Sequence, residues 1–87
     1  MDWNEAAEQL LDSILMTTPL PVRQQIEAHV REKAEAEAEK EGRSRVSTNQ
    51  LVEAWILSTP DALRGELPRQ MERLGLDPEE FSHLLPD

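Results

Sequence analysis

The sequence predicts a small all-α domain of four to five helices built on one long central helix. The central segment is the clearest, because Val22 to Glu41 contains neither proline nor glycine and is rich in strong helix formers. The flanking segments place apolar residues three and four positions apart, which is the period of one helix face. Prolines, glycines and capping residues separate these segments, so each should form its own helix.

The first helix should begin near Asn4, whose side chain can cap it, with Glu5 and Glu8 placed well for the helix dipole. The sequence Thr17-Thr18-Pro19 should end it, because the residue before a proline is pushed out of helical geometry. One apolar stripe is expected to face the core: Trp3, Ala7, Leu10, Leu11 and Ile14.

The central helix is expected from Pro21 to about Glu41. Pro21 suits the first helical position, where its missing N–H would be unpaired anyway, and Gly42 suits a left-handed C-terminal cap. Alternating glutamates near its end predict a solvated face, not a cation site. The predicted buried stripe recurs every four residues: Val22, Ile26, Val30, Ala34 and Ala38.

Shorter helices should complete the domain. Ser47 and Gln50 have the spacing of a capping box, which opens a third helix. Trp55 in this helix is expected in the core, and the alternative is an exposed ring that docks a partner. A fourth helix follows Pro60 and should kink or divide at Pro68, and a last short one begins near Asp77. No internal repeat of 20 residues or more is expected.

Composition limits the function classes open to this chain. Its 87 residues make one small domain, and the absence of cysteine excludes disulfides, thiolate metal sites and thiol nucleophiles. The net charge of −9 argues against binding to a nucleic-acid backbone. No apolar run approaches the roughly 20 residues of a membrane span, and no signal pattern is visible. We expect a soluble, cytoplasmic protein with no membrane partner.

The sequence contains no constellation of catalytic residues. His29 and His83 are far apart, and neither has a partner at ligand spacing. His29 is expected to be a partly buried structural residue beside the apolar stripe of the central helix. There is no glycine-rich phosphate loop and no Gly-x-Ser-x-Gly motif. We therefore predict a protein that is not an enzyme and has no cofactor or metal.

One basic patch surrounds Gly42 and consists of Lys40, Arg43 and Arg45. Cations at a helix C-terminus complement the helix dipole, which is a structural role. The alternative is contact with an anion or a nucleic acid, against which the acidic remainder of the chain weighs.

Short motifs along the first two-thirds of the chain match a known domain. In order they are Trp3, Ala7, Leu11, Pro19-x-x-Val22-Arg23, Glu35-x-x-Ala38-x-x-x-Gly42, Val46, Thr48, Val52 and Ala54. With them the chain resembles the C-terminal domain of the B subunit of light-independent protochlorophyllide reductase, which is also found as small free-standing proteins. The likeness covers roughly residues 3 to 56. Leu20-Pro21 replaces the usual aromatic pair, and residues 58–87 have no counterpart.

The resemblance implies one domain in two parts: a reductase-subunit-like helical domain at residues 1–57 and a helical extension at residues 58–87 packed on it. It implies an accessory, non-catalytic role in docking to a larger protein such as a nitrogenase-like reductase. Arg23 would either fix the turn after Pro19 or meet the partner. The candidate docking residues are Pro19, Val22, Arg23, Glu35 and Trp55.

A second resemblance gives an alternative function. A long helix, a Gly-Arg-x-x-Val-Ser turn and a shorter helix are similar to the end of a histone fold, which pairs as dimers and uses this turn on DNA. Here Lys40, Arg43 and Arg45 would be the contact residues. A homodimer is a further hypothesis, because the core is thin. The stripe proposed to complete it is Leu63, Leu67, Met71 and Leu74.

Overall fold

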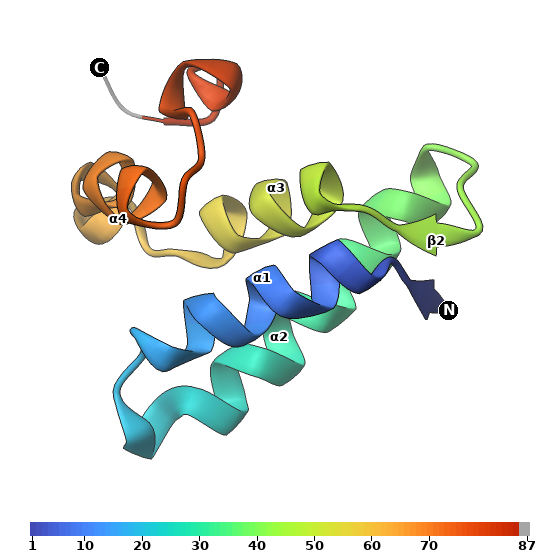
Figure 1. The fold of residues 1–87 in the computed structure, drawn as a ribbon, viewed down its shortest axis with the longest axis horizontal. Helices are drawn as coiled ribbons and strands as arrows, with labels where there is room; N and C mark the ends of the chain where they lie inside the picture. The colour runs from blue at the N-terminus through green and yellow to red at the C-terminus, as the bar shows by residue number, and fades with distance from the viewer. Residues whose placement is uncertain (86–87) are drawn as a thin grey trace.

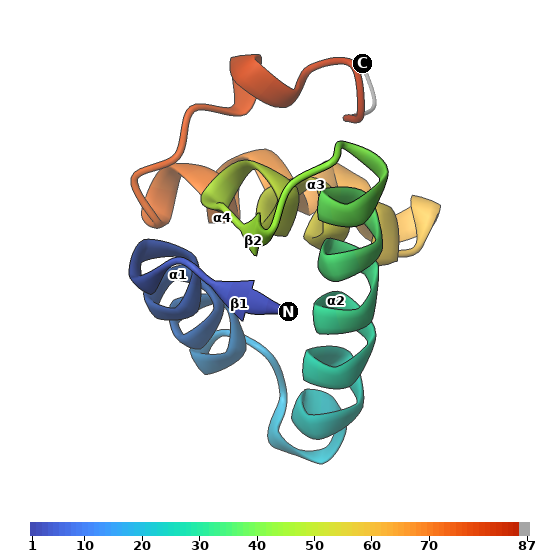
Figure 2. The same cartoon turned by 90° about the vertical axis from the view of Figure 1, so that its right-hand side faces the viewer.

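The computed structural model describes residues 1–85 and confirms an all-α domain (Figure 1). Its helices are α1 (Glu5–Met16), α2 (Leu20–Lys40), α3 (Thr48–Ser58) and α4 (Leu67–Arg73), with short 3-10 helices η1 (Asp61–Glu66) and η2 (Pro78–Phe81). α1 and α2 form a hairpin, and α3 lies between this hairpin and the C-terminal segment (Figures 1 and 2). The predicted boundaries of the central helix are therefore confirmed to within one residue.

A two-stranded parallel ladder, which the sequence analysis did not predict, joins the N-terminus to the turn after α2. Strand β1 (Asp2–Trp3) pairs with β2 (Arg45–Val46), so that Trp3 lies opposite Val46. The Asn4 backbone N–H extends the ladder by donating to the Val46 carbonyl at 2.9 Å. Asn4 does occupy the N-cap position of α1, but its side chain makes no capping bond. Strands of two residues carry no period that a sequence could reveal.

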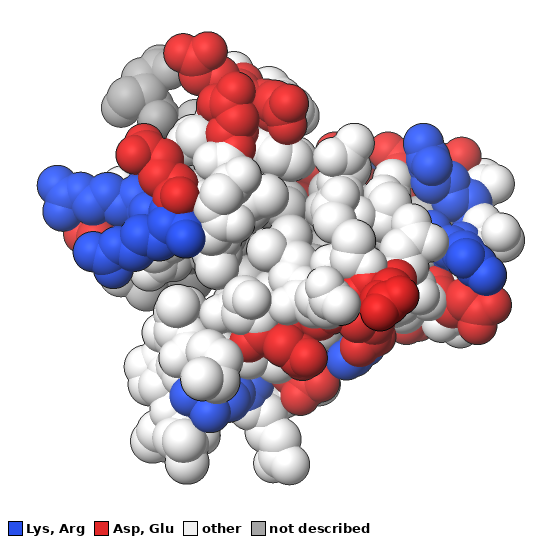
Figure 3. All heavy atoms as spheres, in the orientation of Figure 1, with Lys and Arg blue, Asp and Glu red and all other residues white. Residues whose placement is uncertain are grey.

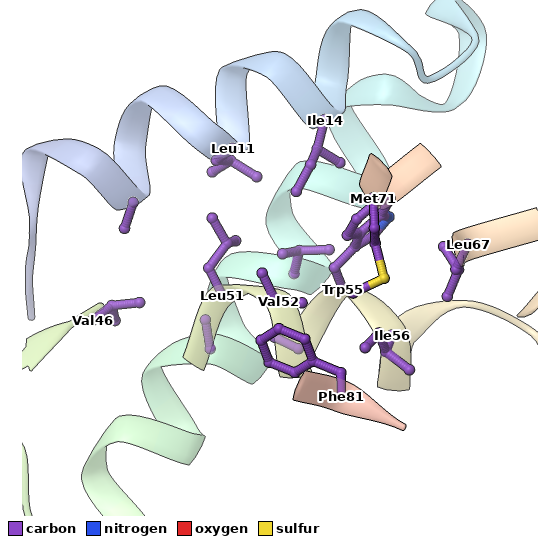
Figure 4. Close-up of a cluster of buried hydrophobic side chains, with 14 of the residues drawn as sticks. Leu11, Ile14, Val46, Leu51, Val52, Trp55, Ile56, Leu67, Met71 and Phe81 are labelled. Carbon is purple, nitrogen blue, oxygen red and sulfur yellow. The ribbon is translucent and has the colours of Figure 1, made fainter. Parts of the chain in front are cut away.

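The core forms where α1 and α3 pack on the C-terminal half of α2, and α4 adds Leu67 and Met71 beside α3 (Figure 4). Val30, Ala34 and Ala38 are fully buried, as predicted, and the two alanines let α3 approach closely. The prediction that Val22 and Ile26 are also buried is wrong, since they are 38% and 37% exposed. Each step of four residues rotates the stripe by about 40° around the helix, so Val22 lies about 80° away from Val30.

The shorter helices follow their predicted signals. Gln50 accepts the Ser47 backbone N–H at 3.0 Å, which is the glutamine half of the predicted capping box. Pro68 lies in the first turn of α4, so the predicted division at this proline is confirmed. Gly42 and Gly75 end α2 and α4 with φ of 72° and 80°, which glycine adopts without steric cost.

The apolar stripe suggested for a homodimer is mostly used inside the chain. Leu67 and Met71 are buried and Leu74 packs partly against the core, so only Leu63 is exposed. The stripe therefore cannot form the proposed dimer face, because α4 turns most of it toward α3.

The turns after α1 and α3 are built alike, which the sequence analysis missed. The Thr18 hydroxyl donates to the Ile14 carbonyl at 3.1 Å, and the Thr59 hydroxyl donates to the Trp55 carbonyl at 2.8 Å. A proline follows each threonine and occupies the N-cap position of the next helix. The aligned identical pairs are Gln9 with Gln50, Leu10 with Leu51, Thr18 with Thr59, Pro19 with Pro60 and Arg23 with Arg64.

An arginine closes each of these turns. Arg23 donates from Nε and Nη2 to the Thr18 carbonyl at 3.3 and 3.0 Å. Arg64 donates from Nε to the Thr59 carbonyl at 3.0 Å and also pairs with Asp61 at 3.1 Å. A charged donor on a carbonyl exposed by the helix end is a stabilising contact. Of the two roles considered for Arg23, the contacts support fixing the turn.

We predict that Arg23→Ala lowers the free energy of unfolding by about 1 kcal/mol, because the Thr18 carbonyl loses its charged donor. Urea unfolding measures the change, with Arg69→Ala as the control, since Arg69 is exposed and outside both turns. Equal stability of the two variants would show that the turn does not need its arginine.

Candidate docking surface

Exposed apolar side chains gather at the end of the molecule that carries the α1–α2 turn. Met16 and Leu20 are 76% and 74% exposed, and Val22 and Ile26 follow on the outer face of α2. Leu63 of η1 is also exposed and belongs to the same region. Figure 3 shows a largely uncharged surface over this end. An exposed apolar patch of this kind typically marks an interaction site.

A groove of about 430 Å³ lies within this region, between the N-terminal half of α2 and the chain that leaves α3. Its lining is Val22, Gln25, Ile26, His29, Ser58, Pro60 and Leu63. Val22 and Leu63 hold matching positions in the two similar turns, one residue before each arginine. The groove therefore lies between the start of α2, which follows the first turn, and the second turn with the start of η1.

A second, smaller hollow continues the groove along α2. It measures about 240 Å³, shares His29 with the groove and is lined also by Glu32, Lys33 and Ala36. The expectation that His29 is partly buried is wrong, because its side chain is exposed at the junction of the two hollows. The same rotation of the stripe that exposes Ile26 also carries His29 outward.

This end of the molecule is nearly free of charge, although the chain carries a net charge of −9. Between Ser13 and Ile26 the single charged residue is Arg23, whose guanidinium is directed back to the Thr18 carbonyl. The centres of protein–protein interfaces are depleted of charged residues in the same way. The surface can therefore lose water to a partner without desolvating a free charge.

The candidate docking residues from the sequence do not form one surface. Pro19 and Val22 are exposed at the apolar end, and Arg23 holds the turn between them and the rest of α2. Trp55 is only 6% exposed and packs in the core beside Met71 (Figure 4), so its alternative role as an exposed docking ring is wrong. The Trp55 ring on α3 points toward α4, and the position of α4 beside α3 could not be predicted from the sequence.

Glu35 is engaged in a contact between β1 and α2. The Trp3 indole N–H donates to Glu35 Oε2 at 2.9 Å, and the Arg31 guanidinium stacks 4.8 Å from the Trp3 ring centroid. Arg31 also forms a bidentate bond to Glu8 at 2.9 and 3.2 Å, which holds the pKa of that carboxyl below its usual value. These contacts tie Glu35 to the fold instead of presenting it to a partner.

The basic residues Lys40, Arg43 and Arg45 are exposed around the turn before β2, away from the groove. A polar hollow of about 360 Å³ lies there, lined by Asn4, Ser47 and the stretch from Gly42 to Arg45. Arg43 lies 3.9 Å from Glu41, and Figure 3 shows acidic side chains next to the basic ones at this end. This mixture of charges gives no broad positive face for a polyanion.

Among the acidic residues near the α2–α3 contact, Glu53 has a raised pKa. Burial raises the pKa of Glu53, and the carboxylates of Glu41 and Glu37 raise it further, while His83 acts in the opposite direction.

Within residues 1–85 no group of three histidine, aspartate or glutamate side chains is arranged to hold a metal ion. In the same part of the chain, no helix has the length and apolar character needed to cross a membrane.

Comparison of the chain with protein-family models, with curated proteins and with solved structures gave no match.

Ser58 contributes an unpaired polar atom to the groove. Its Oγ is buried and has no hydrogen-bond partner within residues 1–85. We predict that Ser58→Ala raises the free energy of unfolding by up to about 1 kcal/mol, because a buried hydroxyl without a partner is destabilising. Thermal unfolding measures the change. Ser13→Ala on the exposed face of α1 is the control for helix propensity, and an equal gain in both variants would contradict the prediction.

Glu53 generates a pH-dependent prediction. Because its pKa is raised in the folded state, the fold favours the protonated carboxyl, and stability is lost as the pH rises above the ordinary value of 4.5. Glu53→Gln should therefore be more stable than the parent at pH 7, by up to about 1 kcal/mol, and lose this advantage toward pH 4.5. Urea unfolding at several pH values tests it. A gain independent of pH, or one matched by exposed Glu72→Gln, would refute the assignment.

Proposed function

We propose that the chain is a non-catalytic, cytoplasmic helical module that docks to a larger protein through the groove between α2 and the α3–η1 connection. The observation that carries the proposal is the uncharged apolar end of an otherwise acidic molecule. A monomer gains nothing by leaving Met16, Leu20 and Ile26 in water, whereas a docking module needs such a surface. In this proposal the module acts by binding, through apolar side chains that a partner would cover.

The resemblance to the B-subunit domain of light-independent protochlorophyllide reductase supports a nitrogenase-like reductase as the partner class. Pro19 and Val22 of the matching motif are exposed at the proposed docking end, and Arg23 keeps the turn between them in place. Trp3 and Glu35, which also belong to the motif, bond to each other and join the N-terminus to α2. In this proposal the motif thus combines residues that hold the hairpin with residues that meet the partner.

The proposal is tested by affinity capture from an extract of the native cell. The parent chain should retain nitrogenase-like reductase subunits, and Ile26→Glu/Leu63→Glu should lose them by at least about tenfold, because two charges would be desolvated in the groove. Both positions are already exposed, so the variant should keep its helical circular dichroism.

A matched control variant and two alternative outcomes make the capture experiment specific to the groove. Ala6→Glu/Asn49→Glu adds the same charge at exposed positions that do not line the groove, and it should bind as the parent does. Recovery of only the chain itself would contradict the proposal. Recovery of only nucleic acid, lost on reversing Arg43 and Arg45, would transfer the function to the histone-like alternative.

A further inference from the structure

We infer that the groove receives an amphipathic α-helix of the partner, with basic side chains flanking its apolar face. This inference rests on the proposed docking function and adds the secondary structure and the charge of the segment that is bound. It derives from the shape of the two joined hollows, from the backbone around them and from the charge of the chain.

The shape of the surface fits a helix. The two hollows share His29 and follow α2 from Val22 to Ala36, a distance of about 21 Å at the rise of an α-helix. A helix lying along α2 over this length has about four turns. It would be held between α2 and the α3–η1 connection over its first two turns, from Val22 to His29, and would lie on α2 alone beyond them. Apolar anchors one turn apart would fill the larger hollow, whose lining includes Ile26 of α2 and Leu63 of η1.

The backbone around the groove does not suit an extended peptide. A peptide that binds as a strand needs a free sheet edge, and the two strands within residues 1–85 are two residues long and lie at the far end of α2. The walls of the groove come from α2, the end of α3 and η1, whose backbone groups are used within helices and turns. Recognition must therefore depend on side chains, as it does for a helix laid in a groove.

The negative charge of the chain favours basic side chains on either side of the apolar face of the bound helix. The groove itself is uncharged, and the charges at its margins balance locally, since Asp61 pairs with Arg64 and Glu32 shares the adjoining hollow with Lys33. The charge preference therefore comes from the molecule as a whole. The net charge of −9 adds a negative potential over the whole molecule, which repels acidic segments and attracts basic ones. A second copy of this chain would bring another −9 to the contact, so the charge favours a different protein as the occupant.

Synthetic peptides test the inference with the full chain. Three labelled peptides of about 18 residues, or five helical turns, are compared by fluorescence anisotropy. The first has a leucine face flanked by lysines, the second has the same face flanked by glutamates, and the third keeps the lysines but scrambles the leucines around the helix. The first should bind, and the other two should bind at least about tenfold more weakly. Added salt should reduce the difference in affinity between the lysine-flanked and the glutamate-flanked peptide, because it screens their charges.

Variants locate the contact. Ile26→Glu/Leu63→Glu should weaken binding of the lysine-flanked peptide by at least about tenfold, and Ala6→Glu/Asn49→Glu should leave it nearly unchanged. Equal binding of the lysine and glutamate peptides would overturn the charge requirement. Equal binding of the scrambled peptide would overturn the amphipathic helix.

Two further outcomes separate this inference from the proposed function. Capture of a reductase subunit that depends on Ile26 and Leu63, without binding of any helical peptide, would keep the docking function and overturn the helical occupant. Sedimentation that shows a dimer of the parent but a monomer of Ile26→Glu/Leu63→Glu would assign the groove to a second copy and overturn the inference.

Discussion

The close contact between α3 and the C-terminal half of α2 determines the rest of this structure. Ala34 and Ala38 are small enough to let α3 lie close to the α2 backbone, and Val30 completes the buried face. Once α3 is placed there, α1 packs Leu11 and Ile14 against the pair, and α4 covers the far side of α3. The N-terminal half of α2 extends beyond this contact, which leaves its outer face without a covering helix.

The long helix therefore has two chemically different halves. Its C-terminal half buries Val30, Ala34 and Ala38 on one side and carries several glutamates around the rest of its circumference, so this half is strongly negative. Its N-terminal half is nearly uncharged and exposes apolar side chains. A strongly acidic surface elsewhere opposes self-association through such an apolar end, so the separation of charge allows an exposed binding surface in a small domain.

The helices could be predicted because residues at their boundaries are typical of a helix start or end, such as Pro19, Gly42 and the Ser47–Gln50 capping pair. The sequence did not predict which part of the four-residue stripe on α2 would be covered, since that depends on where α3 crosses the helix. Val22, Ile26 and His29 were misplaced for this one reason. The β1–β2 ladder was missed because it joins two-residue segments far apart in the chain. The groove could not be predicted at all, because one wall is α2 and the other is the connection from α3 to η1, which is distant in the sequence.

The similar turns after α1 and α3 divide the chain into two units that depend on each other for burial. A single helix–turn–helix unit of this length exposes one apolar face and cannot bury it alone. Two units in one chain cover each other, with α2 and α3 as the contact. Each turn is closed locally by its own threonine, so each unit keeps its shape while the other covers its apolar face. The groove depends on both units, because one wall is α2 and the other is the connection from α3 to η1.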